Sequence, residues 1–214
     1  MLIDHIGIVF FPEELLFRLI GRLALPIFAI RLSNGYKYTR NFNNYFMRIL
    51  FLGIISQPIY IFTFGFDFFQ VFNICFILAF GLLSIHILEK IKEINKNKNI
   101  VYALQGITLT ILIYISHIFS FEYGTYGLLM ILSVYFFKNN IINFMAIFSL
   151  ISFILISGKI HSLQFIPIFL FPFLFYLEEK KFLNINMKVF GFKYAHYLFY
   201  PLHLLLLLII KNYV

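Results

Sequence analysis

Long stretches of apolar residues, separated by short charged connectors, fill most of the chain. They predict helices that cross a lipid bilayer, because about 20 helical residues span a hydrocarbon core of about 30 Å. In lipid each backbone donor needs a partner within its own segment, which favours helices. We therefore predict an all-α fold, a polytopic transmembrane helix bundle of about 8–9 spans, at 2–12, 14–34, 42–64, 70–88, 100–119, 121–137, 141–157, 162–177 and 193–210.

The composition agrees with a chain that lies in lipid. Of its 214 residues, 62% are hydrophobic, 21% are aromatic and 12% are charged. A water-soluble domain of this size could not bury so much apolar surface. Because no connector is long enough to form a separate soluble domain, we predict one integral-membrane domain over residues 1–214 and the lipid bilayer as its surroundings.

The net charge of +8 is explained by where the cations lie. Basic connectors alternate with connectors poor in cations, and only Lys159 departs from this pattern. Because basic connectors stay in the cytoplasm, the even-numbered spans should end inside and the C-terminus should lie outside. Nucleic acid is not an expected partner. The basic connectors carry Lys37, Arg40, Arg48, Lys90, Lys92, Lys96, Lys98, Lys138, Lys180, Lys181 and Lys188, and the others carry Glu13, Glu14, Asp67 and Glu122.

The first apolar run, from Met1 to Phe11, is short for a membrane span. It covers about 16 Å as a helix, and it lacks the charged n-region and cleavage site of a signal peptide. One interpretation is a half-span packed against other helices. The other, which we favour, is that the sequence starts downstream of the natural beginning.

Two arginines lie within the predicted span 14–34. Arg22 falls near mid-depth, where an arginine costs about 2.5–3.5 kcal/mol on an insertion scale. Arg18 lies one turn earlier on the same face, from which its side chain could also reach the outer surface. Pro26 should loosen the helix and free a carbonyl group. Arg22 and Pro26 together predict an internal polar cavity.

Asp4 and His5 are a second polar pair within an apolar run. Consecutive helical residues point about 100° apart, so the two side chains should not form a dyad with each other. We predict that Asp4 is the counter-ion of Arg22 and that His5 faces a reactant. Histidine is the natural proton acceptor near neutral pH, although a purely structural hydrogen bond is the alternative role.

The last span, 193–210, carries His196, Tyr200 and His203 on one face. His203 should lie about 15 Å from the cytoplasmic end, and Pro201 opens the hydrogen-bond ladder beside it. His196 is plausible as an interfacial residue, so His203 is the better candidate. The spacing of acids and histidines resembles no known ligand set, and we predict no metal site.

Milder polar anomalies lie elsewhere in the chain. Gln57 and Asn73 are explained by hydrogen bonds between helices. Glu122-Tyr123-Gly124, followed by Gly127, stands at the outer entrance to the span 121–137. Close contact between helices accounts for these residues, and a substrate entrance is the alternative.

Several blocks of the sequence carry a family pattern. Together they resemble the TraX family of conjugal-transfer membrane proteins, occur in the order of that family and cover nearly the whole chain. The block around Arg22 and Pro26 is the most specific. The blocks are Met1-Leu2-Ile3-Asp4-His5-Ile6-Gly7, Gly21-Arg22-Leu23-Ala24-Leu25-Pro26-Ile27-Phe28-Ala29, Asn34-Gly35-Tyr36-Lys37-Tyr38-Thr39-Arg40-Asn41 with Tyr45 and Arg48, Ile55-Ser56-Gln57-Pro58, Tyr123-Gly124 with Gly127, and Tyr200-Pro201-Leu202-His203.

The resemblance implies an acetyltransferase of the bacterial inner membrane that acetylates the amino-terminal residue of pilin. The chain is also distantly similar to polytopic membrane acyltransferases. It departs from the family at Asn34, where a glutamate is usual, and at Tyr38, where a histidine is frequent. Either substrate choice differs or neither position is catalytic. The family alone does not fix the acceptor, which is pilin or another envelope molecule.

These observations lead to a hypothesis of acetyl transfer from acetyl-CoA to an amine or hydroxyl group. His5 would take the acceptor's proton, and Arg22 or His203 would stabilise the oxyanion or orient the base, with Asp4 fixing Arg22. A non-catalytic carrier or channel with an intramembrane Arg/His/Asp path is the alternative, and a structural partner in pilus assembly is a third. The CoA phosphates would meet Lys37, Arg40 and Arg48, residues that also suit a role in setting topology.

Overall fold

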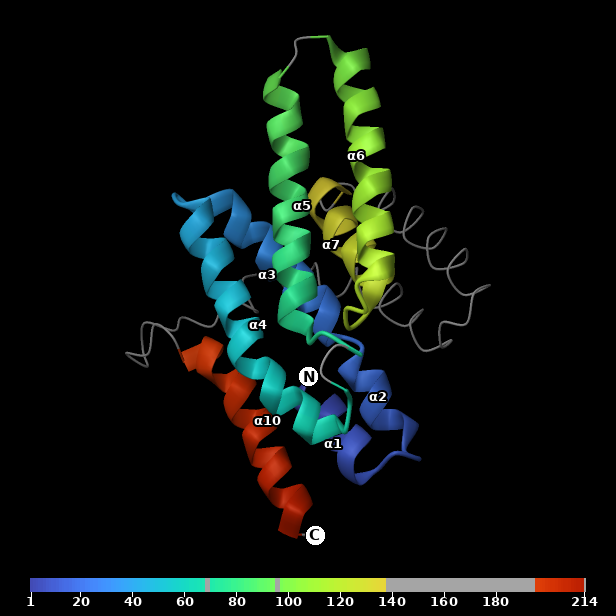
Figure 1. Ribbon diagram of the computed structural model, residues 1–214, viewed down its shortest axis with the longest axis vertical. Helices are drawn as coiled ribbons and strands as arrows, with labels where there is room; N and C mark the ends of the chain where they lie inside the picture. The colour runs from blue at the N-terminus through green and yellow to red at the C-terminus, as the bar shows by residue number, and fades with distance from the viewer. Residues whose placement is uncertain (68–69, 95–96, 138–194, 214) are drawn as a thin grey trace.

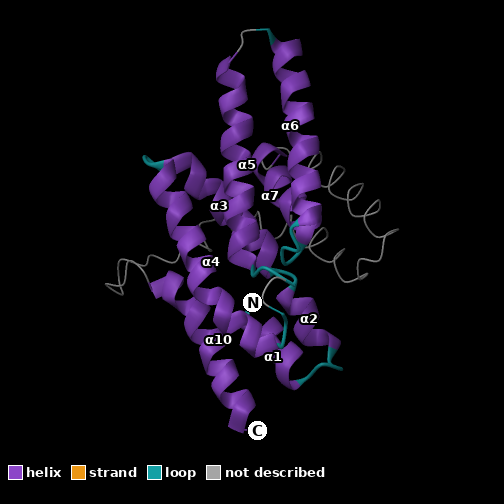
Figure 2. Ribbon diagram, in the orientation of Figure 1, coloured by secondary structure: helices purple, strands orange, loops and turns teal. Residues whose placement is uncertain are grey.

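The computed structural model describes residues 1–67, 70–94, 97–137 and 195–213, with the side chains of the last helix from residue 198 onward. Within this part the regular elements are all helices (Figure 2). Phe72 and Phe121 form an isolated β-bridge. The predicted all-α class is therefore confirmed. The predicted spans 141–157 and 162–177 lie outside the described residues.

The helices overlap the predicted apolar runs, and α4 has the predicted bounds, whereas α5 begins and ends later than the predicted 70–88. Three of them, α4, α5 and α6, are long and apolar enough to cross a membrane among the residues described. α7 and the described part of α10 are shorter apolar helices. The helices are α1 (Leu2–Phe10), α2 (Leu15–Gly21), α3 (Ala24–Tyr38), α4 (Phe42–Phe64), α5 (Ile74–Ile94), α6 (Lys98–Ile118), α7 (Gly124–Phe137) and α10 (Ala195–Tyr213).

Local side-chain chemistry sets several helix ends. The side chain of Asn41 accepts a hydrogen bond from the backbone N–H of Asn44 at 2.9 Å, and α4 begins there. Asn97 caps α6 in the same way. Such caps satisfy amide groups that have no partner within the helix. α4 ends at Gly65, whose φ of 72° suits glycine because it has no Cβ.

The predicted single span 14–34 is wrong, because the chain forms two helices there. The break falls at Arg22 and Leu23, between α2 and α3. Pro26 lies in the first turn of α3, where its missing N–H costs no helical hydrogen bond. Pro26 therefore belongs to the first turn of α3, and the break between α2 and α3 lies about one turn before it.

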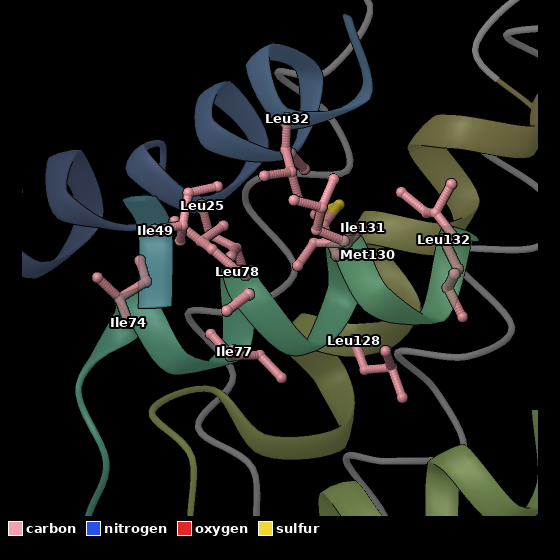
Figure 3. Packing of buried hydrophobic residues seen from close by; sticks show 14 of the residues in the cluster. Leu25, Leu32, Ile49, Ile74, Ile77, Leu78, Leu128, Met130, Ile131 and Leu132 are labelled. Atoms are coloured by element: carbon pink, nitrogen blue, oxygen red, sulfur yellow. The ribbon is translucent and has the colours of Figure 1, made fainter. Parts of the chain in front are cut away.

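An apolar three-helix core, made by α3, α5 and α7, occupies the centre of the molecule (Figure 3). Aliphatic side chains from the three helices interlock with almost no exposed surface. Gly81 lets α5 approach α7, because a Cβ there would lie 2.6 Å from Cδ1 of Ile131. The most buried side chains of the three-helix core include Leu25, Ile30, Ile77, Leu82, Leu128, Met130 and Ile131.

The other helices pack around this core (Figure 1). α6 forms a long hairpin with α5 at the top of the view, while α4 runs beside α10 at the lower left. α1 packs against α2 and α10 near the bottom. The basic connector between α3 and α4 and the adjacent ends of α5 and α6 lie toward the top, whereas the acidic α1–α2 connector lies toward the bottom.

Gln57 and Asn73 link α4 to the start of α5, as predicted. Asn73 donates through Nδ2 to Oε1 of Gln57 at 2.8 Å and to the carbonyl oxygen of Gly53 at 2.9 Å. Its Oδ1 accepts from the backbone N–H of Cys75. The polar side chains are satisfied by other protein groups, which explains how they tolerate burial.

Candidate functional site

Two histidines from opposite ends of the sequence meet in the interior. Nδ1 of His5, on α1, lies 3.0 Å from Nε2 of His203, on α10. The two rings are nearly parallel, with centroids 5.1 Å apart. His5 is 1% exposed and His203 is 5% exposed. We call His5 and His203 the histidine pair.

The hydrogen bonds of the histidine pair fix its tautomers when both rings are neutral. Nδ1 of His203 lies 2.8 Å from the carbonyl oxygen of Phe199, which only accepts, so this nitrogen carries the hydrogen. Nε2 of His203 is then the acceptor for Nδ1–H of His5. It follows that Nε2 of His5 carries a lone pair, which is the form that a general base requires.

Asp4 pairs with an arginine other than the one predicted. Its Oδ1 lies 3.1 Å from Nη1 of Arg18, and this ion pair joins α1 to α2. The prediction that Asp4 pairs directly with Arg22 is therefore wrong, because its ion pair is with Arg18. The two helices approach closely because Gly21 has no side chain, and a Cβ at that position would collide with Asp4. The side chain of Arg18 is 28% exposed, so it contacts the buried carboxylate of Asp4 while part of it remains at the protein surface.

Arg22 lies at the break between α2 and α3 and is buried, with 9% of its surface exposed. Its guanidinium carbon lies 5.3 Å from the centre of the Tyr123 ring, a cation–π distance. The predicted internal placement of this arginine is therefore correct. Tyr123 adopts a φ of 68°, and the turn that it makes brings the α6–α7 connector against Arg22.

Glu122 lies in the connector between α6 and α7, where the sequence predicted close helix contact, with a substrate entrance as the alternative. Its backbone N–H donates to the carbonyl oxygen of Phe72 at 2.7 Å. Burial, and to a smaller extent the nearby carboxylate of Asp4, raise the pKa of Glu122 to about 7, although the backbone amide of Ile74, and then Arg22 and Arg18, act in the opposite direction. A carboxyl group tuned in this way can exchange a proton near neutral pH.

Several buried polar side-chain atoms have no hydrogen-bond partner among the described residues. They include Oε2 of Glu122, Nε of Arg22 and the hydroxyl of Tyr200, whose ring lies beside that of His203. Such groups are rare in proteins because each loses its hydration without compensation. Sequence reasoning placed Tyr200 on the face of His203 but gave it no role. The signal was its i, i+3 spacing from His203 in a helix whose other polar residues are few.

The basic residues predicted to bind CoA lie far from the histidine pair. Lys37, Arg40 and Arg48 are exposed, near the end of α4 opposite to Phe64, whose ring contacts His5. The helical rise places Arg48 about 24 Å from Phe64 along α4. A groove of about 560 Å³ begins at this basic end and runs between α4 and α10. Its lining residues are Asn44, Met47, Arg48, Phe51, Leu52, Ile55, Leu198 and Pro201.

The fold and these contacts define a polytopic helical membrane protein that buries histidine, arginine and carboxyl groups. The chain belongs to the TraX protein family, whose model matches residues 1–211, and the sequence resemblance is confirmed. It is 28% identical, over 232 aligned residues, to the probable fimbrial assembly protein FimC, serogroup H1, of Dichelobacter nodosus. The alignment covers 97% of this chain and 89% of that protein. No solved structure matches the chain.

Proposed function

We propose that this protein is a membrane-embedded acetyltransferase that moves an acetyl group from acetyl-CoA to the amino terminus of a pilin or to another envelope acceptor. The observation that carries the proposal is the histidine pair, which is buried and holds a lone pair on Nε2 of His5. The TraX family and the fimbrial relative support a place in pilus assembly.

The reaction needs a base and a site for negative charge. The acceptor nitrogen attacks the thioester carbonyl carbon, a C–N bond forms, and the C–S bond breaks. Nε2 of His5 takes a proton from the attacking nitrogen and returns it to the departing thiolate. His203 holds the ring of His5 through their shared hydrogen bond. Arg22 is the buried cation available to stabilise the oxyanion.

The donor would approach from the basic end of the molecule. Arg48 stands at the mouth of the groove between α4 and α10, where a guanidinium suits a phosphate group. The groove extends about 16 Å along α4, from Asn44 to Ile55, and its other wall ends at Pro201, two residues before His203. An extended thioester arm fits such an apolar path, with Lys37 and Arg40 adding positive charge outside it.

The charge of the connectors supports an orientation in the bacterial inner membrane. The basic ends would face the cytoplasm, where acetyl-CoA is made, and the C-terminus would lie outside. In a bundle of the predicted 8–9 spans, the donor would then reach the histidine pair from the cytoplasmic side, and an envelope acceptor would reach it from the other side.

Purified protein in nanodiscs tests the proposal through CoA release from acetyl-CoA and the mass of an amino-terminal pilin peptide. We expect acetylated peptide with the wild type and a loss of about 10²–10⁴-fold with His5→Ala. His117→Ala is the matched control, because His117 is exposed on α6. CoA release that is unchanged in both His5→Ala and Arg22→Ala would contradict the proposal.

The second candidate, a carrier or channel, is favoured by one feature, the direct hydrogen bond between two buried histidines. Such a contact also suits a proton path. Proton flux into liposomes that disappears in His5→Ala, without any acetylated peptide, would support this function in place of acetyl transfer.

A further inference from the structure

Two of the unpartnered polar groups lie near each other, and one of them is next to the histidine pair. Tyr200 lies on α10 with its ring centre 5.4 Å from that of His203. Its hydroxyl is buried and unpartnered among the described residues, as is Oε2 of Glu122. The two side chains are electrostatic neighbours, and both lie next to the backbone amide of Ile74. Glu122 is thus a neighbour of Tyr200, and Tyr200 is a neighbour of His203.

Neither nearby arginine forms an ion pair with the carboxyl group of Glu122 among the described residues. Asp4 is already paired with Arg18. Among the described residues no ion pair within 4.0 Å joins Arg22 to Glu122, and Arg22 instead lies over Tyr123. A buried carboxyl oxygen with neither a hydrogen bond nor an ion pair is costly unless a ligand supplies the missing donor.

We propose that Glu122 and Tyr200 form the subsite that receives the acceptor's primary amine, as an ammonium ion, beside the histidine pair. This inference rests on the proposed function and names the acceptor chemistry of the same site. We call these two residues the amine subsite.

The hydrogen-bond inventory favours an ammonium over a hydroxyl group. A primary ammonium ion has three N–H donors. The amine subsite and the histidine pair together would offer three acceptors, namely Oε2 of Glu122, the hydroxyl oxygen of Tyr200 and Nε2 of His5. A hydroxyl group has one donor and would leave two of these acceptors unsatisfied, so the subsite selects an amine.

The amine subsite also accounts for the protons. The bound ammonium loses its first proton to the carboxylate of Glu122, which leaves a neutral amine. That amine attacks the acetyl thioester, and its second proton passes through His5 to the leaving thiolate. Glu122 returns its proton to water after the product leaves. Ammonium and acetyl thioester thus give amide, thiol and one released proton.

The test compares a pilin amino-terminal peptide with the same peptide already acetylated, using full-length protein in nanodiscs. Binding and steady-state kinetics are measured for Glu122→Gln and Tyr200→Phe. Matched controls are Glu93→Gln and Tyr102→Phe, which make the same changes at exposed positions on α5 and α6. Glu122→Asp serves as the conservative variant, because it keeps the charge.

We expect wild type to bind the free amine better than the acetylated peptide. Glu122→Gln should raise the peptide KM about 10–100-fold, as the loss of a charged hydrogen bond predicts, and should leave the acetyl-CoA KM unchanged. Tyr200→Phe should have a smaller effect in the same direction, and Glu122→Asp should recover part of the loss.

Two results separate this inference from the proposed function. Acetyl transfer with an unchanged peptide KM in folded Glu122→Gln and Tyr200→Phe would overturn the amine subsite and leave the transferase intact. Selective binding of the free amine that Glu122→Gln removes, in a protein that transfers no acetyl group, would support the subsite and overturn the transferase.

Discussion

The three-helix core and the neighbouring polar region solve burial in opposite ways. In the core, aliphatic side chains of α3, α5 and α7 interlock, and close approach at Gly81 is the main steric demand. In the polar region, α1, α2 and α10 bury histidine, aspartate and arginine, and several atoms stay unsatisfied. The first arrangement favours stability, whereas the second keeps costly polar groups, as is typical of functional sites.

The histidine pair should behave as one unit, and this is the largest expected effect. His5→Ala and His203→Ala should each slow acetyl transfer, with His5→Ala losing about 10²–10⁴-fold. The double variant should be no slower than His5→Ala, because His203 acts through the ring of His5. Single-turnover rates with acetyl-CoA and peptide measure this. Losses that multiply would show that the two histidines act separately.

The three-helix core should control stability without touching the chemistry. Ile131→Ala removes a fully buried side chain and should lower the free energy of unfolding by about 2–5 kcal/mol. Unfolding in mixed micelles measures the change. The rate of acetyl transfer per folded molecule should remain that of the wild type, and a fall in that rate would show that the core and the polar region are coupled.

The ion pair between Arg18 and Asp4 should contribute more than an exposed pair. Arg18→Ala leaves the carboxylate of Asp4 buried without its partner and should cost about 1–3 kcal/mol, less than for a fully buried pair because Arg18 is partly exposed. The control is Lys90→Ala, which breaks an exposed pair with Glu93 and should cost about 0–1 kcal/mol. Equal shifts in unfolding midpoint would refute the difference.

Gly21 should be intolerant of even one methyl group. Gly21→Ala places a Cβ against Asp4 and should cost about 1–3 kcal/mol through overpacking. Gly106→Ala, at a position on α6 where a Cβ meets nothing within 4 Å, should be neutral or slightly stabilising. Thermal unfolding of the two variants in one detergent provides the comparison, and a neutral Gly21→Ala would show that α1 and α2 separate easily.

Apolar periodicity predicted most of the described fold, because a membrane span is set by local hydrophobicity and length. α4 has the bounds expected from its run, and Gln57 and Asn73 make the expected interhelical bonds. The break at Arg22 was placed at Pro26 because proline in a helix interior is disruptive. Whether Pro26 is interior depends on where α3 begins, and that depends on tertiary packing.

The candidate site was only partly predictable, because the contacts between its side chains also depend on tertiary packing. His5, Arg22 and His203 stood out because lipid excludes polar groups. Which arginine meets Asp4 depends on how α2 turns back on α1, and the sequence pattern does not specify that turn. Glu122 was overlooked as a site residue because an acid in a connector is ordinarily exposed. The structure instead buries its Oε2, in a connector whose backbone is hydrogen-bonded to Phe72.

The histidine pair joins positions that are 198 residues apart in the sequence. During synthesis the first histidine therefore enters the membrane long before its partner exists. If the proposed function is correct, a nascent or truncated chain that lacks α10 cannot form the histidine pair and should have no acetyltransferase activity.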